Sequence, residues 1–169
     1  MQIADVQIRE AAREDESALT ELAYEYLSWA IERLRSDRGV EWPAITRDDV
    51  AEAIDSYRNG GAILIATVDA APVGMGALRR LDEGAFEIKR MYVRPAARGH
   101  RVGARILDDL LLRARAAEGR VVRLDTIVFM DDAQRLYRSR GFVQRGPYEE
   151  SEIPTRLQAH WLFFELALR

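Results

Sequence analysis

Small and basic residues are concentrated in the segment from Glu87 to Gly103, which is suited to binding an anion. The sequence there predicts an apolar strand that stops at Pro95, a loop rich in arginine and glycine, and an amphipathic helix. Backbone N–H groups of such a loop and of a helix N-terminus converge on one small region, where the helix dipole favours negative charge. Gly99 and Gly103 allow the backbone to approach a ligand closely. We therefore expect this loop to bind phosphate or pyrophosphate.

Two side chains near this loop can move protons. Glu87 lies in the preceding strand, where a carboxylate can accept a proton from a nucleophile. Strict strand alternation puts Met91 and Val93 on the face of Glu87. Lys89 shares that face, and an ion pair with Glu87 is the alternative to a catalytic role. Tyr137, on a later predicted helix, can donate a proton to a leaving thiolate, and simple core packing is the alternative there.

The composition indicates one globular domain over residues 1–169. The chain has 169 residues, of which 48% are hydrophobic and 31% charged, and no apolar run approaches the ~20 residues of a membrane span. It has no Cys, which excludes disulfides, thiolate metal sites and a cysteine nucleophile, and its two His disfavour a multi-histidine metal site. The first five residues lack a signal-peptide pattern. We expect a cytoplasmic protein that binds neither metal nor membrane.

Charge is distributed unevenly along the chain. Residues 1–60 hold 14 acidic and 7 basic side chains, whereas residues 86–115 hold 8 basic and 3 acidic ones. The basic middle suits an anionic cofactor, and the acidic N-terminal part suits a cationic substrate. A solvated arginine-rich surface is the alternative.

The periodicity predicts an α+β fold of about seven strands. The predicted strands are Val6–Arg9, Ala62–Val68, Val73–Leu78, Ala85–Val93, Val121–Thr126, Gly141–Gln144 and Trp161–Leu168. The predicted helices begin at Asp15 and Thr46 and span Val102–Glu118 and Asp131–Arg140. The long crossover helix after Pro95 implies one parallel pair of strands in an otherwise antiparallel sheet.

The loop and a second motif about 40 residues downstream together resemble the GNAT superfamily of N-acetyltransferases. The family loop pattern, [QR]-x-x-G-x-[GA], aligns with Arg98-Gly99-His100-Arg101-Val102-Gly103. Arg98 and Gly103 match, and Arg101 replaces the central glycine. The second family pattern, Asn-x-x-Ala-x-x-x-Tyr-x-x-x-Gly-Phe, aligns with Met130 to Phe142. Here Met130 replaces the asparagine, and the matching residues are Ala133, Tyr137, Gly141 and Phe142.

The resemblance implies a mixed, mostly antiparallel sheet of about seven strands flanked by about four helices, with acetyl-coenzyme A as co-substrate. It also implies direct attack by an amine in a ternary complex, with Glu87 as general base, acting directly or through water, and Tyr137 as general acid. Backbone of the strand around Met91 to Val93 would pair with the pantetheine and the acetyl carbonyl. The residues implied to bind the cofactor are Met91, Tyr92, Val93, Arg98, Gly99, His100, Arg101, Val102, Gly103 and Ala104.

Two features bear on the acceptor, a primary amine of a small molecule or amino acid. Trp29, Trp42 and the loop Ser36–Ile45 are expected near its pocket, and the acidic segment 147–154 is expected at its rim. The substitutions Arg101 and Met130 leave a second class open, a degenerate sensor or partner domain that binds acyl-coenzyme A without turnover. The net charge of −3 makes nucleic-acid binding by the arginine-rich helix improbable. The apolar strand from Trp161 suits a homodimer edge.

Overall fold

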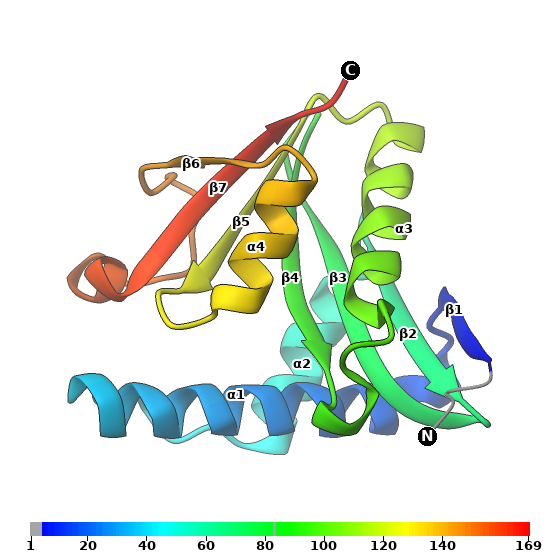
Figure 1. Cartoon of the computed structure of the whole chain (residues 1–169), viewed down its shortest axis with the longest axis horizontal. Coiled ribbons are helices and arrows are strands. Elements are labelled where there is room, and N and C mark those ends of the chain that lie inside the picture. The colour runs from blue at the N-terminus through cyan, green and yellow to red at the C-terminus, as the bar shows by residue number, and fades with distance from the viewer. Residues whose placement is uncertain (1–4, 83) are drawn as a thin grey trace.

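The computed structural model describes residues 5–82 and 84–169. Most of the N-terminal segment examined for a signal peptide, and Glu83 of a turn predicted at 81–84, lie outside these ranges. The described residues form seven strands and four α-helices (Figure 1). In chain order these are β1 (Val6–Glu10), α1 (Glu16–Arg38), α2 (Arg47–Ser56), β2 (Ala62–Val68), β3 (Ala71–Asp82), β4 (Ala85–Val93), α3 (Val102–Ala116), β5 (Val121–Ile127), α4 (Asp131–Ser139), β6 (Val143–Arg145) and β7 (Trp161–Ala167).

The strands form one mixed sheet in the order β1-β2-β3-β4-β5-β7-β6. Only β4 and β5 pair in parallel, across the α3 crossover, and the other neighbours are antiparallel. This confirms the predicted α+β class, and the bounds of β2 and β4 agree with the prediction residue for residue. β3 is longer than predicted because its hairpin with β4 continues to Asp82 opposite Ala85.

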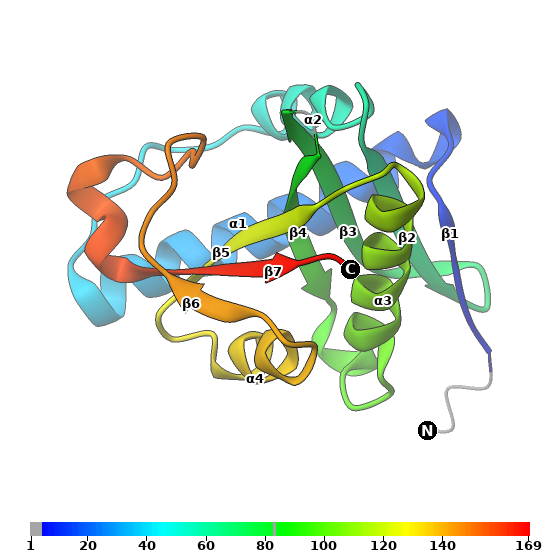
Figure 2. The same cartoon turned by 90° about the horizontal axis from the view of Figure 1, so that it is seen from above.

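Helices cover both faces of the sheet, as the two views show (Figures 1 and 2). One face packs against α3 and α4 through a core that includes Phe86, Ile88 and Ile106. The other face packs against α1 and α2 through a core that includes Leu22 and Met75. A third cluster joins the C-terminal half of α1 to β7 and the loops around it. The site described below lies between these layers.

Local signals fix where the first two helices begin. Thr46 and Asp49 form the predicted capping box of α2, with the Asp49 N–H donating to Thr46 Oγ1 at 3.1 Å. Asp15 occupies the N-cap position of α1, as predicted, but its side chain does not cap that helix. Its carboxylate instead accepts from the Ala12 N–H at 2.8 Å and from Arg9.

The predicted role of the C-terminal strand as a dimer edge is wrong. β7 lies inside the sheet, where it pairs with β5 on one side and β6 on the other. Phe163 and Phe164 are buried. Their apolar character therefore serves the core of this chain, and the strands at the edges of the sheet are β1 and β6.

Candidate active site

A β-bulge at Arg90 divides β4 into two parts. Arg90 and Met91 both lie opposite Gly76, because Lys89 pairs with Ala77 and Tyr92 pairs with Met75. Arg90 has a left-handed backbone with φ of 53°, which is uncommon for a residue with a side chain. The glycine on β3 is required, since a Cβ on Gly76 would lie 2.6 Å from Ile106 and 2.8 Å from Met91.

The bulge reverses the alternation of β4, so the prediction that Met91 and Val93 share the face of Glu87 is wrong. Both side chains pack instead on the α3 side of the sheet, with Ile88. Tyr92 packs on the opposite side, against α1 and α2. The extra residue at the bulge is the physical cause, because it shifts the period-2 pattern by one.

Beyond the bulge, β4 and β5 separate. Among the described residues their parallel pairing runs from Ala85 with Val121 to Ile88 with Leu124, while β5 continues along β7. The Arg94 N–H donates to Val73 O on β3 at 2.8 Å. Since alternate residues of a strand bond to opposite sides, the N–H group of Val93 faces the gap between β4 and β5. This predicted backbone donor therefore borders an opening in the sheet.

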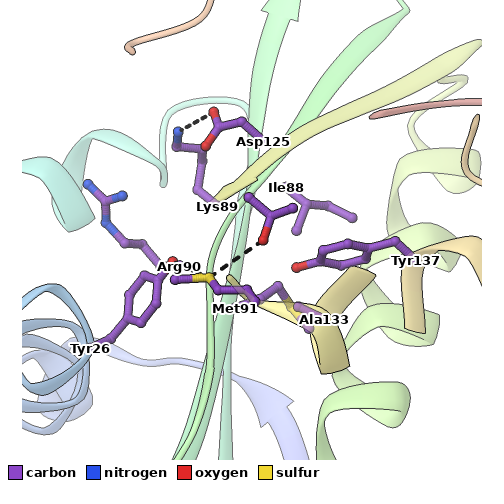
Figure 3. Close-up of a pocket in the computed structure, with 10 residues that line it drawn as sticks. Tyr26, Ile88, Lys89, Arg90, Met91, Asp125, Ala133 and Tyr137 are labelled. Atoms are coloured by element: carbon purple, nitrogen blue, oxygen red, sulfur yellow. Dashed lines mark hydrogen bonds and ion pairs between the residues drawn. The ribbon is translucent and has the colours of Figure 1, made fainter. Parts of the chain in front are cut away.

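A cavity of about 50 Å³ occupies this gap (Figure 3). Its walls come from α1, β4, β5, α4 and the loop before α4: Tyr26, Ile88, Lys89, Arg90, Met91, Asp125, Thr126, Met130, Ala133 and Tyr137. Burial raises the pKa of Tyr137, and Tyr26 and Asp125 raise it further. The phenol is thus kept as a proton donor at neutral pH.

Met130 occupies the position of the asparagine in the family pattern, at the N-cap of α4. Its sulfur accepts weak contacts from Thr126 Oγ1 at 3.5 Å and Tyr26 OH at 3.7 Å. No side chain caps α4. Met130 therefore lines the cavity without supplying the amide that the family pattern places there.

The predicted phosphate loop joins the open end of β4 to α3. Arg98 donates from Nε to Val93 O at 2.9 Å and so ties the loop to the strand. Gly99 and Arg101 have positive φ of 82° and 60°, and no side chain caps α3. No described side chain therefore accepts a hydrogen bond from the first N–H groups of α3. This is what an anion site requires, because these N–H groups must be able to bind the anion.

The side chains of this loop differ in their exposure. His100 and Arg101 are exposed, whereas Val102 is buried in the core. Val102 can therefore contribute only its backbone to a ligand. A Cβ on Gly103 would lie 3.7 Å from Val93, in ordinary contact, so a small side chain fits there.

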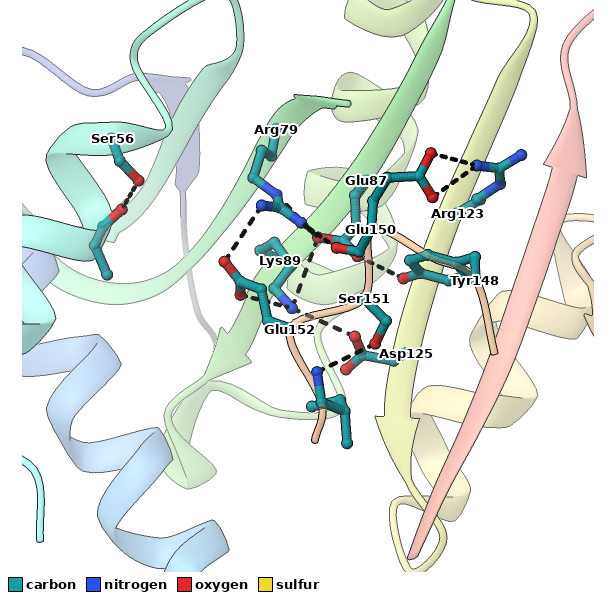
Figure 4. Close-up of polar contacts among 12 residues, drawn as sticks. Ser56, Arg79, Glu87, Lys89, Arg123, Asp125, Tyr148, Glu150, Ser151 and Glu152 are labelled. Carbon is teal, nitrogen blue, oxygen red and sulfur yellow. Dashed lines mark hydrogen bonds and ion pairs between the residues drawn. The ribbon is translucent and has the colours of Figure 1, made fainter. Parts of the chain in front are cut away.

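Glu87 lies in a buried ion network on the other side of β4 (Figure 4). Its side chain is 0% exposed. Arg79 donates to Glu87 Oε1 at 2.8 Å, and the Tyr148 hydroxyl donates to Oε2 at 2.5 Å. Burial and the charge of Glu87 together raise the pKa of Tyr148. Both oxygens of Glu87 therefore already accept hydrogen bonds.

Lys89 connects Glu87 to two further carboxylates. Its Nζ lies 3.7 Å from Glu87, which confirms the predicted pairing, and 3.3 Å from both Asp125 and Glu152. Burial lowers the pKa of Lys89, but Asp125, Glu87 and Glu152 outweigh it, so the pKa is raised overall. Lys89 is therefore charged and fully engaged.

A second cavity, of about 240 Å³, lies between α1, α2 and the sheet. It shares Tyr26, Lys89, Arg90 and Asp125 with the smaller cavity, so the two meet at the bulge. Its remaining walls are mostly apolar: Leu27, Ala30, Ile31, Leu34, Trp42, Ile45, Asp49, Val50, Ala53, Ile127, Glu152, Ile153 and Trp161. A molecule in the larger cavity would thus lie next to one in the gap.

Some predicted acceptor residues line this cavity and others do not. Trp42 and Glu152 do. Trp29 packs instead on Phe129, with ring centroids 5.9 Å apart, and is 41% exposed. Glu150 lies near Arg123, outside the cavity.

Sequence reasoning assigned no role at the site to Tyr26, Arg79, Arg90 or Asp125, and it placed Tyr148 only within the rim segment 147–154. These five residues come from five separate elements or loops. For Asp125 alone the sequence contained a usable signal. The alternation of β5 places its side chain on the face opposite Leu124 and Thr126.

Comparison with known proteins identifies the family. The sequence matches the "Acetyltransferase (GNAT) domain" over residues 59–144, which contain both the open half of β4 and the phosphate loop. The chain belongs to the GNAT acetyltransferase family. Its fold is the GNAT fold that the motifs predicted.

Relatives and solved structures agree with this assignment. The chain is 41% identical over 86 residues to the IAA acetyltransferase of Azospirillum brasilense, an alignment that covers 50% of this chain and 56% of that protein. The chain thus spans little more than half the length of that relative. A GNAT-family acetyltransferase of Staphylococcus aureus Mu50 superposes with a TM-score of 0.76 at 22% identity, covering 98% of this chain and 100% of that one.

A further GNAT-fold structure contains a ligand. YncA of Salmonella typhimurium, solved with its cofactor acetyl-CoA, superposes with a TM-score of 0.69 at 20% identity, covering 97% of this chain and 94% of that one. At this identity the likeness concerns the fold.

Two other kinds of site are absent from the described residues. Residues 5–82 and 84–169 contain no group of three or more His, Asp or Glu side chains that could hold a metal ion. Within the same residues no helix is both long and apolar enough to cross a membrane.

Proposed function

We propose that this GNAT protein transfers an acetyl group from acetyl-coenzyme A to a primary amine of a small molecule or amino acid. The observation that carries the proposal is the opening between β4 and β5, where the parallel pairing ends at Ile88 and Leu124 and the Arg94 N–H, bonded to β3, leaves that of Val93 facing the gap. The gap cavity and the larger cavity meet there. An amine in one can attack a thioester in the other directly, in a ternary complex.

The cofactor would extend from the phosphate loop along the open half of β4. The loop residues Arg98 to Ala104 suit the pyrophosphate, because the N-terminus of α3 lacks a side-chain cap. The backbone N–H group facing the gap suits the acetyl carbonyl, and such a donor contributes about 2.7–4 kcal/mol in other acyl-transfer sites. Tyr137, which lines the gap, would protonate the leaving thiolate.

The substrate ammonium would first lose a proton to the carboxylate network at the junction of the cavities, and the neutral amine would then attack the thioester. Glu87 is the general base that the sequence suggested. Because both of its oxygens accept hydrogen bonds, the geometry favours proton uptake through water at Asp125 or Glu152, with Glu87 fixing Lys89 and Arg79 around them. Comparing the pH dependence of kcat/KM for Glu87→Gln and Asp125→Asn separates the two routes.

Two substitutions at Gly103 test cofactor binding without disturbing the core. Gly103→Asp adds a negative charge to the first turn of α3, which suits the helix dipole but repels pyrophosphate. Gly103→Ala is the matched control, since a Cβ fits there. Calorimetric titration with acetyl-coenzyme A should give micromolar binding for the wild type and Gly103→Ala, and binding at least about tenfold weaker for Gly103→Asp. Equal affinities for all three proteins would contradict the proposed pyrophosphate site.

Turnover is then measured as amine-dependent release of the coenzyme A thiol. Release with some primary amine supports the enzyme. Micromolar acetyl-coenzyme A binding without release for any amine in a broad panel would favour the sensor alternative.

A further inference from the structure

Arg90 has an unusual position at the junction of the two cavities. It lines both of them, and Figure 3 shows its side chain extending from β4 away from Tyr137, on the side of Lys89 and Tyr26. Its Nε is buried and has no hydrogen-bond partner among the described residues. Such a donor is costly to leave unpaired. The guanidinium is thus poised for an acceptor that the described residues do not provide.

The other charged groups of the junction are already engaged. Lys89 contacts Glu87, Asp125 and Glu152 within 3.7 Å. Arg79 binds Glu87 and lies 3.3 Å from Glu152. Arg90, by contrast, takes part in no ion pair within 4 Å with a described residue. Its charge acts on Glu152 only at longer range, and its guanidinium lies 5.9 Å from the ring centre of Tyr57. Its planar fork is suited to binding a carboxylate.

The backbone of Arg90 also points to a functional role. Its φ of 53° is a strained conformation for a non-glycine residue, and it lies at the bulge where the sheet opens. Strain of this kind gathers at ligand sites, where the surrounding structure maintains it. The bulge directs the guanidinium to the junction.

The larger cavity indicates the rest of the ligand. Its walls away from the junction are mostly aliphatic or aromatic, among them Ile31, Leu34, Trp42 and Trp161, with Asp49 as a charged exception. Its volume of about 240 Å³ lies below the ~300–1,000 Å³ of drug-sized sites. A compact ligand with an apolar body fits this space.

We infer that the acceptor is an α-amino acid with an apolar side chain, whose carboxylate binds Arg90. Its amino group would lie beside Asp125 and Glu152, and its side chain would fill the larger cavity. Arg90 and Asp125 both lie at the junction, so a positive and a negative group face a ligand whose own opposite charges are only two bonds apart. The inference rests on the proposed acetyl transfer for its chemistry, and it names the substrate class.

Matched pairs of ligands that differ only in the carboxylate test this inference. The pairs are L-phenylalanine with phenethylamine and L-leucine with isoamylamine. The wild type should acetylate the amino acid with a kcat/KM at least about tenfold above that of the amine. Arg90→Gln should abolish this preference by raising KM for the amino acid, and it should leave kcat/KM for the amine unchanged. Arg90→Lys keeps the charge and should restore part of the preference.

Arg13→Gln is the control for a lost positive charge, because Arg13 is exposed and lies outside both cavities. It should behave as the wild type. The inference is overturned if the wild type uses amine and amino acid equally, if it uses neither although acetyl-coenzyme A binds, or if Arg90→Gln lowers both alike. That last result would mean that Arg90 only supports the fold.

A binding readout separates this inference from the proposed function. Trp42 and Trp161 line the larger cavity, so their fluorescence reports an occupant without any cofactor. Wild-type protein should bind L-phenylalanine more tightly than phenethylamine, and Arg90→Gln should not. If the wild type did not bind acetyl-coenzyme A, the proposed acetyl transfer would be overturned. The fluorescence titrations would still show whether Arg90 binds the carboxylate of the amino acid.

Discussion

The two halves of β4 share one strand but have different surroundings. From Ala85 to Ile88 the strand pairs with β3 on one side and β5 on the other. From Lys89 to Val93 it pairs with β3 alone, and its other edge borders a cavity. The closed half has its hydrogen bonds satisfied within the sheet, and the open half retains a backbone donor for a ligand.

A single extra residue lies close to the point where the two halves meet. The bulge at Arg90 turns Met91 and Val93 toward α3, and the parallel pairing with β5 ends two residues earlier, at Ile88. A mostly buried strand can thus be rigid at one end and a binding site at the other. Substitutions in the closed half should therefore change stability, and those around the open half should change activity.

The largest expected effect is on stability, in the closed half. Phe86→Ala removes a ring that is almost fully buried and should lower the free energy of unfolding by about 3–5 kcal/mol. Met91→Ala, in the open half and only partly buried, should lower it by about 1–2 kcal/mol. Urea unfolding followed by circular dichroism measures both. A larger loss for Met91→Ala than for Phe86→Ala would contradict the division of β4.

The next effect is on turnover, at the open half. Tyr137→Phe removes the proposed proton donor and should lower kcat about 100-fold, with acetyl-coenzyme A affinity changed less than about threefold. Tyr148→Phe is the matched control. It leaves one oxygen of Glu87 without its partner and should lower the free energy of unfolding by about 1–3 kcal/mol. If Tyr137→Phe changed kcat and acetyl-coenzyme A affinity equally and only slightly, Tyr137 would not be the proton donor.

A smaller effect concerns the loop that follows the open half. Arg101 has φ of 60°, a conformation that costs a non-glycine residue about 1–2 kcal/mol. Replacing Arg101 by glycine removes this cost, but the greater flexibility of glycine in the unfolded chain offsets part of the stability gained. Arg101→Gly should therefore raise the free energy of unfolding by about 0.5–1 kcal/mol. The same change at Arg105, inside α3, should lower it by about 1 kcal/mol. Destabilisation by both would mean that the Arg101 side chain stabilises the loop.

The smallest effect is on the acid stability of the network beside the bulge. Burial raises the pKa of Glu152, but Lys89, Arg79 and Arg90 outweigh it, and the pKa lies below its ordinary value. The charged carboxylate thus stabilises the fold above about pH 4.5, and this contribution is lost as pH falls through the folded-state pKa. Glu152→Gln should flatten the fall in melting temperature between about pH 5 and pH 3. Glu149→Gln, an exposed neighbour, should leave that fall unchanged.

The sequence predicts regular elements well where local patterns decide the structure. β4 was predicted from Ala85 to Val93 by its apolar run between a turn and Pro95, and α2 by its capping box. The loop before α3 was predicted by its glycines and arginines. These signals act within a few residues, so no tertiary contact is needed to recognise them.

The bulge and the ion network could not be predicted in this way. Nothing in the sequence near Arg90 marks the extra residue, and the glycine opposite it, Gly76, lies on another strand beneath Ile106 of α3. The hydrogen bond from Tyr148 to Glu87 joins residues that are 61 positions apart. Which charges pair, and which cation stays unpaired, depends on these distant contacts.

Hydrogen exchange along β4 tests the central claim most directly. Amides of residues 85–88 should exchange slowly with or without acetyl-coenzyme A, because the sheet already protects them. Amides of Met91 and Val93, and those of residues 98–104, should become protected only when acetyl-coenzyme A is added. Unchanged exchange of these amides at saturating cofactor, or protection confined to other parts of the chain, would contradict the assignment of the open half of β4 as the cofactor site.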